Sequence, residues 1–263
     1  MKNQWHVLRA VVRWASMTVL LAGGLFLAAG TTRIPMLRAY IAVFSVLLLV
    51  TLLAVDPGLA EERAHPGTEG QDARGRFVSG FLFLVTVGFA AMDVGRLHES
   101  DSVPAALSII ALFVLAAALG FQAWAMIENP FFSPTLRIQG ERGHHLVTTG
   151  PYRWLRHPGY LAMSVSIPAS ALAIGSWLAL IPAAGFCLVI VRRARLEDEF
   201  LRLNLPNYID YMETTSGGLL PHLSLFQAYM SNVSASPAHY PRALVRCCGR
   251  DAGLPSAPRT DPY

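Results

Sequence analysis

Two clusters of polar residues stand out in an otherwise apolar chain. The first spans residues 150–160, which read Gly-Pro-Tyr-Arg-Trp-Leu-Arg-His-Pro-Gly-Tyr, and the second spans residues 192–201, which read Arg-Arg-Ala-Arg-Leu-Glu-Asp-Glu-Phe-Leu. The arginines in the first cluster can pair with a carboxylate or a phosphate through their two-pronged guanidinium groups. The acidic residues in the second can receive an amine or hydroxyls. The two clusters together indicate a site for a small charged ligand.

Aromatic residues and glycines add to what these clusters can bind. Tyr152, Trp154, Tyr160 and Tyr208 offer faces for a flat ring or a soft cation. Glycines 150 and 159 allow a backbone to approach a ligand closely. A ligand with an amino acid end, a cationic centre and an aromatic ring would use all of these groups. S-adenosylmethionine is such a molecule, and the residues equally allow a nucleotide or a lipid headgroup.

The stretch between the clusters decides how they can meet. Residues 159–191 are 33 residues without Asp, Glu, Lys, Arg or His. A single helix of that length would be about 50 Å long, whereas about 20 residues cross the roughly 30 Å hydrocarbon core of a membrane. Pro168, Gly175 and Pro182 are spread through the middle of the stretch. We therefore expect a helical hairpin over 159–191 that returns both clusters to one membrane face.

The composition indicates an integral membrane protein. Hydrophobic residues make up 53% of the chain and charged residues 14%, against about 25% charged in soluble domains. Further apolar runs cover residues 14–30, 39–55, 77–95 and 104–127. With the hairpin, these runs predict an all-α membrane protein of about six hydrophobic helices. We expect a four-helix region over 1–127, a catalytic region over 128–221 and a flexible tail over 222–263.

The distribution of basic residues predicts the orientation. With the N-terminus in the cytoplasm, 14 Lys and Arg residues flank the spans on the inside and 3 on the outside. This places the N-terminus and the ligand pocket on the cytoplasmic side, in a bacterial inner membrane. The net charge of +4 follows from these flanking residues, so nucleic acid is not an expected partner. His144-His145 has no third ligand at a metal-binding spacing; we expect a solvated loop there and no metal.

The two clusters and their separation resemble one protein family. The elements of the resemblance are Gly150-Pro151-Tyr152-Arg153, Arg156-His157-Pro158-Gly159-Tyr160, the apolar hairpin, Arg193-x-x-x-Glu197-Asp198-x-x-Leu201 and Tyr208-x-x-Tyr211. This combination is similar to the isoprenylcysteine carboxyl methyltransferase family, which is grouped with the phosphatidylethanolamine N-methyltransferases. Upstream, Asn129-Pro130-Phe131-Phe132-Ser133 and Arg137-Ile138-Gln139 resemble bacterial members. The resemblance covers about residues 128–212.

The resemblance implies a membrane-embedded methyltransferase that uses S-adenosylmethionine. The implied acceptor is lipophilic, a prenylcysteine-type carboxylate or a phospholipid amine, and enters from the surrounding membrane lipids. The implied catalytic residues are Arg193 and Glu197. The implied cofactor-binding residues are Gly150, Tyr152, Arg153, Arg156, His157, Pro158, Tyr160, Glu197 and Asp198.

One departure from the family leaves alternatives open. The family commonly carries an arginine shortly before a proline after the tyrosine pair, whereas residues 216–221 here read Ser-Gly-Gly-Leu-Leu-Pro. A catalytically inactive membrane binding or assembly protein on the same scaffold is therefore the main alternative. A membrane reductase related to the sterol reductases ranks last, because the chain carries no separate nicotinamide signature.

Overall fold

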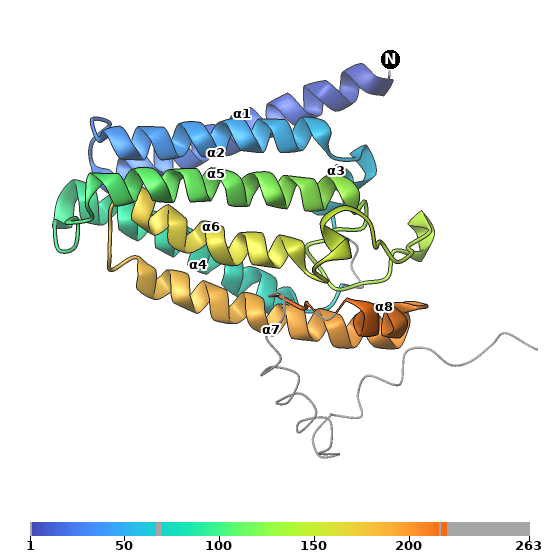
Figure 1. Ribbon diagram of the computed structural model, residues 1–263. Helices are drawn as coiled ribbons and strands as arrows, with labels where there is room; N and C mark the ends of the chain where they lie inside the picture. Colours follow the sequence, from blue (N-terminus) through green and yellow to red (C-terminus); the bar gives the residue numbers. More distant parts are fainter. Residues whose placement is uncertain (1, 67–69, 216, 220–263) are drawn as a thin grey trace, which may run out of the picture. The chain divides into compact units, whose positions relative to one another are not determined.

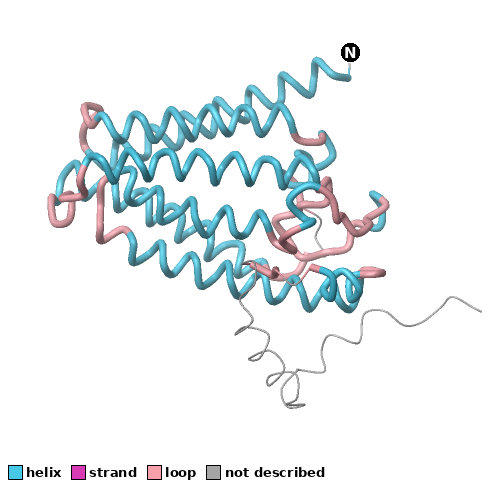
Figure 2. The backbone as a smooth tube through the Cα atoms, viewed as in Figure 1, coloured by secondary structure: helices cyan, strands magenta, loops and turns pink. Residues whose placement is uncertain are grey.

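The regular elements of the protein are helices throughout the part that the structure describes. This computed structural model describes residues 2–66, 70–215 and 217–219. Within these ranges, the residues in strand-like pairing are Gln71 and Leu136, which form one isolated antiparallel bridge. Figure 2 shows helices joined by loops. The all-helical expectation is confirmed for this part, while the tail expected at 222–263 lies outside the described residues.

Among the described residues, four helices are long and apolar enough to cross a membrane. They are α1 (Lys2–Ala29), α2 (Pro35–Ala54), α4 (Ala73–Met92) and α5 (Ala105–Glu128), and their apolar windows begin or end close to the four predicted runs. Large apolar side chains such as Leu20, Leu27 and Phe113 are more than two thirds exposed on their surfaces. Such all-round hydrophobicity is typical of helices that contact lipid. An integral membrane protein is therefore supported.

Two further helices occupy the stretch between the polar clusters. Helix α6 (Pro158–Ile174) begins at a proline. The N–H groups of a first helical turn have no partner within the helix, so proline, which lacks an N–H, loses no hydrogen bond there. The helix ends at Gly175, whose φ of 117° suits a residue without a side chain. Helix α7 (Leu180–Asn204) follows and contacts α6, and the two lie side by side in Figure 1. That both cross the membrane, which would make six spans, stays a prediction.

Small residues allow the helices to pack closely. The largest buried cluster combines Ala29, Ala90, Ala91, Ala171 and Ala173 with bulkier side chains from α2 and α5. Helix α6 contacts α5, α4 and α2 as well as α7, so it is the most enclosed of the apolar helices. In membranes, close backbone approach at small residues replaces part of the hydrophobic driving force. This packing holds the second half of α6 against its neighbours, at the end away from the first polar cluster.

A buried carboxylate joins the loops at one end of the helices. Asp93, in the π-helical turn Asp93–Leu97 that ends α4, is fully buried. It accepts hydrogen bonds from the backbone N–H groups of Glu99 and Ser100 and from the hydroxyls of Ser100 and Ser176. Ser176 lies in the turn between α6 and α7. Asp93 therefore ties this turn to the α4–α5 connection, and a buried carboxylate with this many donors is well satisfied.

The opposite end carries the short helices and the long loops. Helix α3 (Pro57–Ala64), the loop 129–157 and helix α8 (Tyr208–Thr214) gather there in Figure 1. The loop is held by the Gln71–Leu136 bridge, with N–O distances of 2.9 and 3.3 Å. Both polar clusters lie at this end, where α6 begins and α7 ends; that the two helices form a hairpin within a membrane stays a prediction.

Candidate functional site

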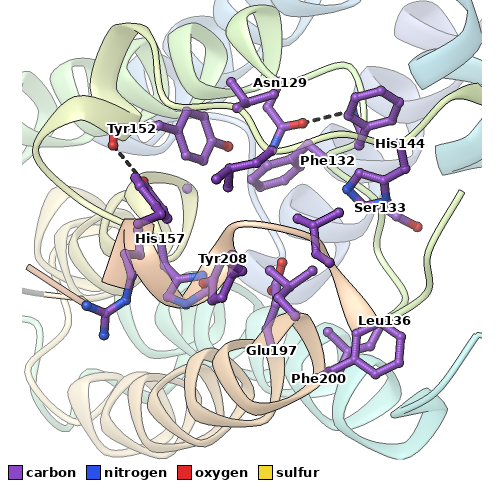
Figure 3. A pocket seen from close by; sticks show the side chains of 18 of the residues that line it. Asn129, Phe132, Ser133, Leu136, His144, Tyr152, His157, Glu197, Phe200 and Tyr208 are labelled. Atoms are coloured by element: carbon purple, nitrogen blue, oxygen red, sulfur yellow. Dashed lines mark hydrogen bonds between the residues drawn. The ribbon is translucent and has the colours of Figure 1, made fainter. Parts of the chain in front are cut away.

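A cavity lies between the loop 129–147, the start of α6, the second half of α7 and helix α8. It encloses about 790 Å³ of space between atoms, a volume that includes open solvent at its mouth. Figure 3 shows side chains from these segments converging on it. Six of the residues expected from the sequence line the cavity, namely Tyr152, Arg156, His157, Pro158, Tyr160 and Glu197.

A tight turn presents the first cluster. Residues Gly150–Arg153 form a 3-10 turn that begins with Gly150 at a φ of 54°. A side chain at Gly150 would also collide with Glu128 at the end of α5. The ring of Tyr152 is buried, and its carbonyl accepts a hydrogen bond of 2.6 Å from the hydroxyl of Tyr211. The turn is thus held between α5 and α8.

The glycine at the start of α6 makes room for a neighbouring ring. A side chain at Gly159 would overlap the ring of Phe132, and both residues line the cavity. The sequence argument expected Gly159 to allow a ligand to approach. In the structure, it is the Phe132 ring that occupies the space next to this glycine, so the glycine positions a wall of the cavity.

Asp198 is the centre of the polar network that joins the clusters. It accepts two hydrogen bonds from the guanidinium of Arg156 (3.2 and 3.0 Å) and one of 2.7 Å from the hydroxyl of Tyr208. Its Oδ1 is also 2.8 Å from Nε2 of His157. Burial works against the carboxylate charge, but the charges and hydrogen bonds of His157 and Arg156 outweigh it and hold the pKa of Asp198 well below its usual range. The network therefore carries an ionised carboxylate.

The same network decides the charge on His157. Burial opposes protonation of its ring, yet the nearby charge of Asp198 and their hydrogen bond raise the pKa of His157, with a smaller contribution from Glu197. The ring also stacks on Tyr160 at 5.5 Å. Protonated histidine is thus favoured, and it completes an ion pair with Asp198.

The network also holds the segment after α8. The guanidinium of Arg156 donates to the carbonyl of Thr215 at 2.8 Å. The backbone N–H groups of Arg156 and His157 donate to the carbonyls of Gly217 and Gly218, at 2.9 and 3.3 Å. The glycine pair that stands where the family commonly has an arginine therefore lies directly against the first polar cluster.

Glu197 and Asp198 are adjacent in sequence but differ in surroundings. Glu197 lines the cavity, whereas Asp198 does not. Among the described residues, no cationic side chain forms an ion pair with Glu197, and its neighbour is the hydroxyl of Tyr160. A cavity-facing carboxylate without a cationic partner is suited to receive a positively charged group of a ligand.

The remaining predicted residues lie around the cavity. Arg193 is only 4% exposed; it donates to the carbonyl of Pro134 at 2.9 Å and lies 3.4 Å from the carboxylate of Asp72. It therefore braces the loop that covers the cavity and also lies next to Tyr160. Arg153 is exposed. Neither these two arginines nor Gly150 and Asp198 line the cavity, so their predicted contacts with a ligand stay predictions.

Sequence reasoning missed much of the loop that covers the cavity. Asn129, Phe131, Leu136 and His144 line it, and the signal for the first two was the Asn-Pro-Phe-Phe-Ser motif. The sequence placed His144 in a solvated loop, but its ring is half-buried and stacks on Phe131 at 4.5 Å. Burial, helped by the charge of His145, lowers the pKa of His144 to about 4. This histidine is therefore neutral at pH 7.

Metal ligation finds no support in the part of the chain that the structure describes. Within residues 2–66, 70–215 and 217–219, no group of three or more His, Cys, Asp or Glu side chains is arranged to hold a metal ion. The chemistry of the site is that of charged, aromatic and hydroxyl groups.

Comparison with known proteins identifies similar sequences. Residues 109–204 match the model of the "Isoprenylcysteine carboxyl methyltransferase (ICMT) family". The chain is 32% identical over 147 residues to the nickel-cobalt-cadmium resistance protein NccN of Alcaligenes xylosoxydans xylosoxydans, covering 55% of this chain and 64% of that protein. It is 33% identical over 97 residues to the cobalt-zinc-cadmium resistance protein CzcN of Cupriavidus metallidurans, covering 35% of this chain and 43% of that protein. The chain thus spans less than two thirds of each relative.

Proposed function

We propose that the protein is a membrane-embedded methyltransferase that uses S-adenosylmethionine, and the match of residues 109–204 to the isoprenylcysteine carboxyl methyltransferase family supports this proposal. The observation that carries this proposal is the contrast between the two adjacent carboxylates. Asp198 holds the site together through Arg156, His157 and Tyr208, whereas Glu197 faces the cavity and forms no ion pair within the described part of the chain.

The residues present fit the cofactor. Glu197 would receive its α-amino group, and the electron-rich face of Tyr160 suits a sulfonium cation. The rings of Phe131, Tyr152 and Tyr208 line the same cavity and offer surfaces for an adenine. His157 and Pro158 would form the floor beneath them.

When bound, the cofactor supplies a methyl group on an electrophilic sulfonium. The protein then contributes mostly positioning and electrostatics. A carboxylate acceptor needs no base, whereas an amine acceptor must lose a proton. Asp198 favours the protonated form of His157, and a ring that already carries its proton cannot accept another. Glu197 is therefore the group that would accept this proton, and Arg193 would act through its neighbour Tyr160.

The acceptor in this proposal is lipophilic and reaches the cavity from the membrane. The cavity lies at the end where α2 and α5 finish, close to the expected membrane boundary. A prenylcysteine-type carboxylate and a phospholipid amine both satisfy this position. The excess of basic residues on this side supports a cytoplasmic cavity in a bacterial inner membrane.

Calorimetric titration of purified protein with S-adenosylmethionine and S-adenosylhomocysteine tests the cofactor. Wild type should bind with micromolar affinity, and Glu197→Gln should lose at least tenfold, because the amine then meets a neutral amide. Glu199→Gln is the matched control, since Glu199 pairs with Arg202 outside the cavity. Absence of binding by folded, monodisperse wild-type protein would refute the proposal.

The main alternative is a scaffold that has lost catalysis, and the Gly217–Gly218 contacts with Arg156 and His157 favour it as the second candidate. Such a scaffold differs from the enzyme in that it does not transfer methyl groups to an acceptor. Transfer of labelled methyl groups to membrane lipids or prenylated thiols would support the enzyme. Tight cofactor binding without transfer to any of these acceptors would favour the inactive scaffold.

A further inference from the structure

One arginine differs from all others in the described residues. Each arginine that is not exposed forms an ion pair with a carboxylate, except Arg63. Arg63 is only partly buried, and none of its nitrogens is a buried atom without a hydrogen-bond partner, so its unpaired charge stays accessible to a ligand that approaches from outside. The paired arginines are Arg13 with Glu61, Arg137 with Glu62, Arg142 with Asp56, Arg156 with Asp198, and Arg193 with Asp72.

The surroundings of Arg63 leave most of its donors unused. Its Nη1 donates one long hydrogen bond of 3.3 Å to the carbonyl of Phe132, and its guanidinium carbon lies 5.5 Å from the centre of that ring. The two preceding residues of α3, Glu61 and Glu62, point to Arg13 and Arg137 instead. Burial lowers the pKa of Arg63, but a guanidinium stays protonated in proteins. No carboxylate in residues 2–66, 70–215 and 217–219 therefore forms an ion pair with this positive charge.

This charge lies beside the cavity, at the end of the protein where α2 and α5 finish. Phe132, which Arg63 covers, lines the cavity and packs against Gly159; Figure 3 shows its ring among the lining side chains. Phe132 also packs on the apolar cluster of Val55, Leu59 and Met126, where α2 and α5 end. An amphiphile whose hydrocarbon lies in the membrane would bring its headgroup to this position.

We propose that Arg63 binds an anionic group of the acceptor, a carboxylate or phosphate joined to a hydrocarbon chain, at the Phe132 side of the cavity. The inference rests on the proposed function, because it assumes that the cavity receives a lipophilic acceptor. It adds a specificity residue outside residues 109–204, so the family match does not assign it. The guanidinium fork suits both anions, and two N–H donors would face either one.

Short amphiphiles test this without requiring turnover. Hexanoate, hexyl phosphate and hexanol are titrated calorimetrically into detergent-solubilised protein, with empty micelles as the blank. Wild type should bind the anions about tenfold or more tightly than hexanol, as expected for charge-assisted hydrogen bonds. Arg63→Gln should lose this preference and Arg63→Lys should keep part of it. Arg74→Gln, the removal of an exposed arginine away from the cavity, should keep all of it.

Two further measurements distinguish the possible reasons for a negative result. S-adenosylmethionine binding is measured on each preparation, so failure of the proposed function is seen separately from failure of the Arg63 inference. Phenylglyoxal modification of wild type, mapped by mass spectrometry, should be slowed at Arg63 by hexanoate and unaffected by hexanol, even if Arg63→Gln does not fold. Equal binding of anions and alcohol by wild type, or an anion preference that survives Arg63→Gln, would overturn the inference.

Discussion

Replacing Asp198 with asparagine removes the charge at the centre of the network that joins the two polar clusters. Arg156 and His157 would then face each other without an anion between them. Removing one partner of a buried ion pair costs about 3–5 kcal/mol. The side chains of Asp198 and Arg156 are 18% and 13% exposed, and the amide oxygen still accepts one bond. We therefore expect a loss at the lower end, about 3 kcal/mol.

Thermal unfolding followed by tryptophan fluorescence measures this loss. For a chain of this size, about 3 kcal/mol corresponds to a fall in Tm of roughly 6–12 °C. Tyr208→Phe is the internal comparison, because it removes one 2.7 Å donor to Asp198 without leaving a charge unpaired. Its cost should be smaller, about 1.5 kcal/mol. If Asp198→Asn unfolds within 1 °C of wild type, the network does not stabilise the fold and the reasoning fails.

The pH dependence of the same variant provides a second readout. The folded pKa of His157 is raised, so its stabilising contribution is complete below its unfolded pKa of about 6.5 and is lost as pH rises through the folded value. The folded pKa of Asp198 is depressed, so its contribution is complete above about pH 4 and is lost as pH falls through the folded value. The difference in stability between wild type and Asp198→Asn should therefore become smaller on both sides of this window. Asp198→Asn should show neither dependence.

Two further predictions concern the walls of the cavity. Gly159→Ala should destabilise the protein by about 1–3 kcal/mol and weaken cofactor binding, because the new methyl group displaces the Phe132 ring. Gly120 has open space around it, so Gly120→Ala should not destabilise the protein. Equal effects of the two substitutions on Tm would contradict this explanation. His144 has a pKa lowered to about 4, so wild-type stability should fall as pH drops from about 6.5 through about 4. This loss, measured by unfolding at stepped pH, should disappear in His144→Gln and persist in His145→Gln.

Much of the helical fold was predictable because apolar runs in membrane proteins translate directly into helices. Backbone N–H and C=O groups in lipid must form hydrogen bonds within their own segment, so a helix is the structure expected for each long apolar run. Breakers such as Gly175 then marked where α6 ends. The crossing of α6 and α7 was not decided this way, because Pro158–Ile174 has 17 residues, which is short for a span.

The site was predictable at the level of its two clusters but not of its individual contacts. Motif spacing indicated that Tyr152, His157 and Glu197 would meet, and they line one cavity. The motif spacing did not distinguish the role of Glu197 from that of Asp198. Adjacent residues on a helix point about 100° apart, so the contacts of each depend on the element that faces it. Arg156, His157 and helix α8 face the carboxylate of Asp198, whereas the carboxylate of Glu197 faces the open cavity.

The amino-acid order was thus sufficient for the membrane class, the helices and the residue types at the site, because hydrophobicity and helix geometry act locally. The partnering of charges required the packed molecule. Arg63 and Arg193 read alike as basic residues beside apolar runs. Arg193 is nevertheless paired with Asp72, whereas no described carboxylate pairs with Arg63. Such pairing depends on which loops and helix ends the packing of α2, α5, α6 and α7 brings within a few ångströms, and no local pattern encodes that distance.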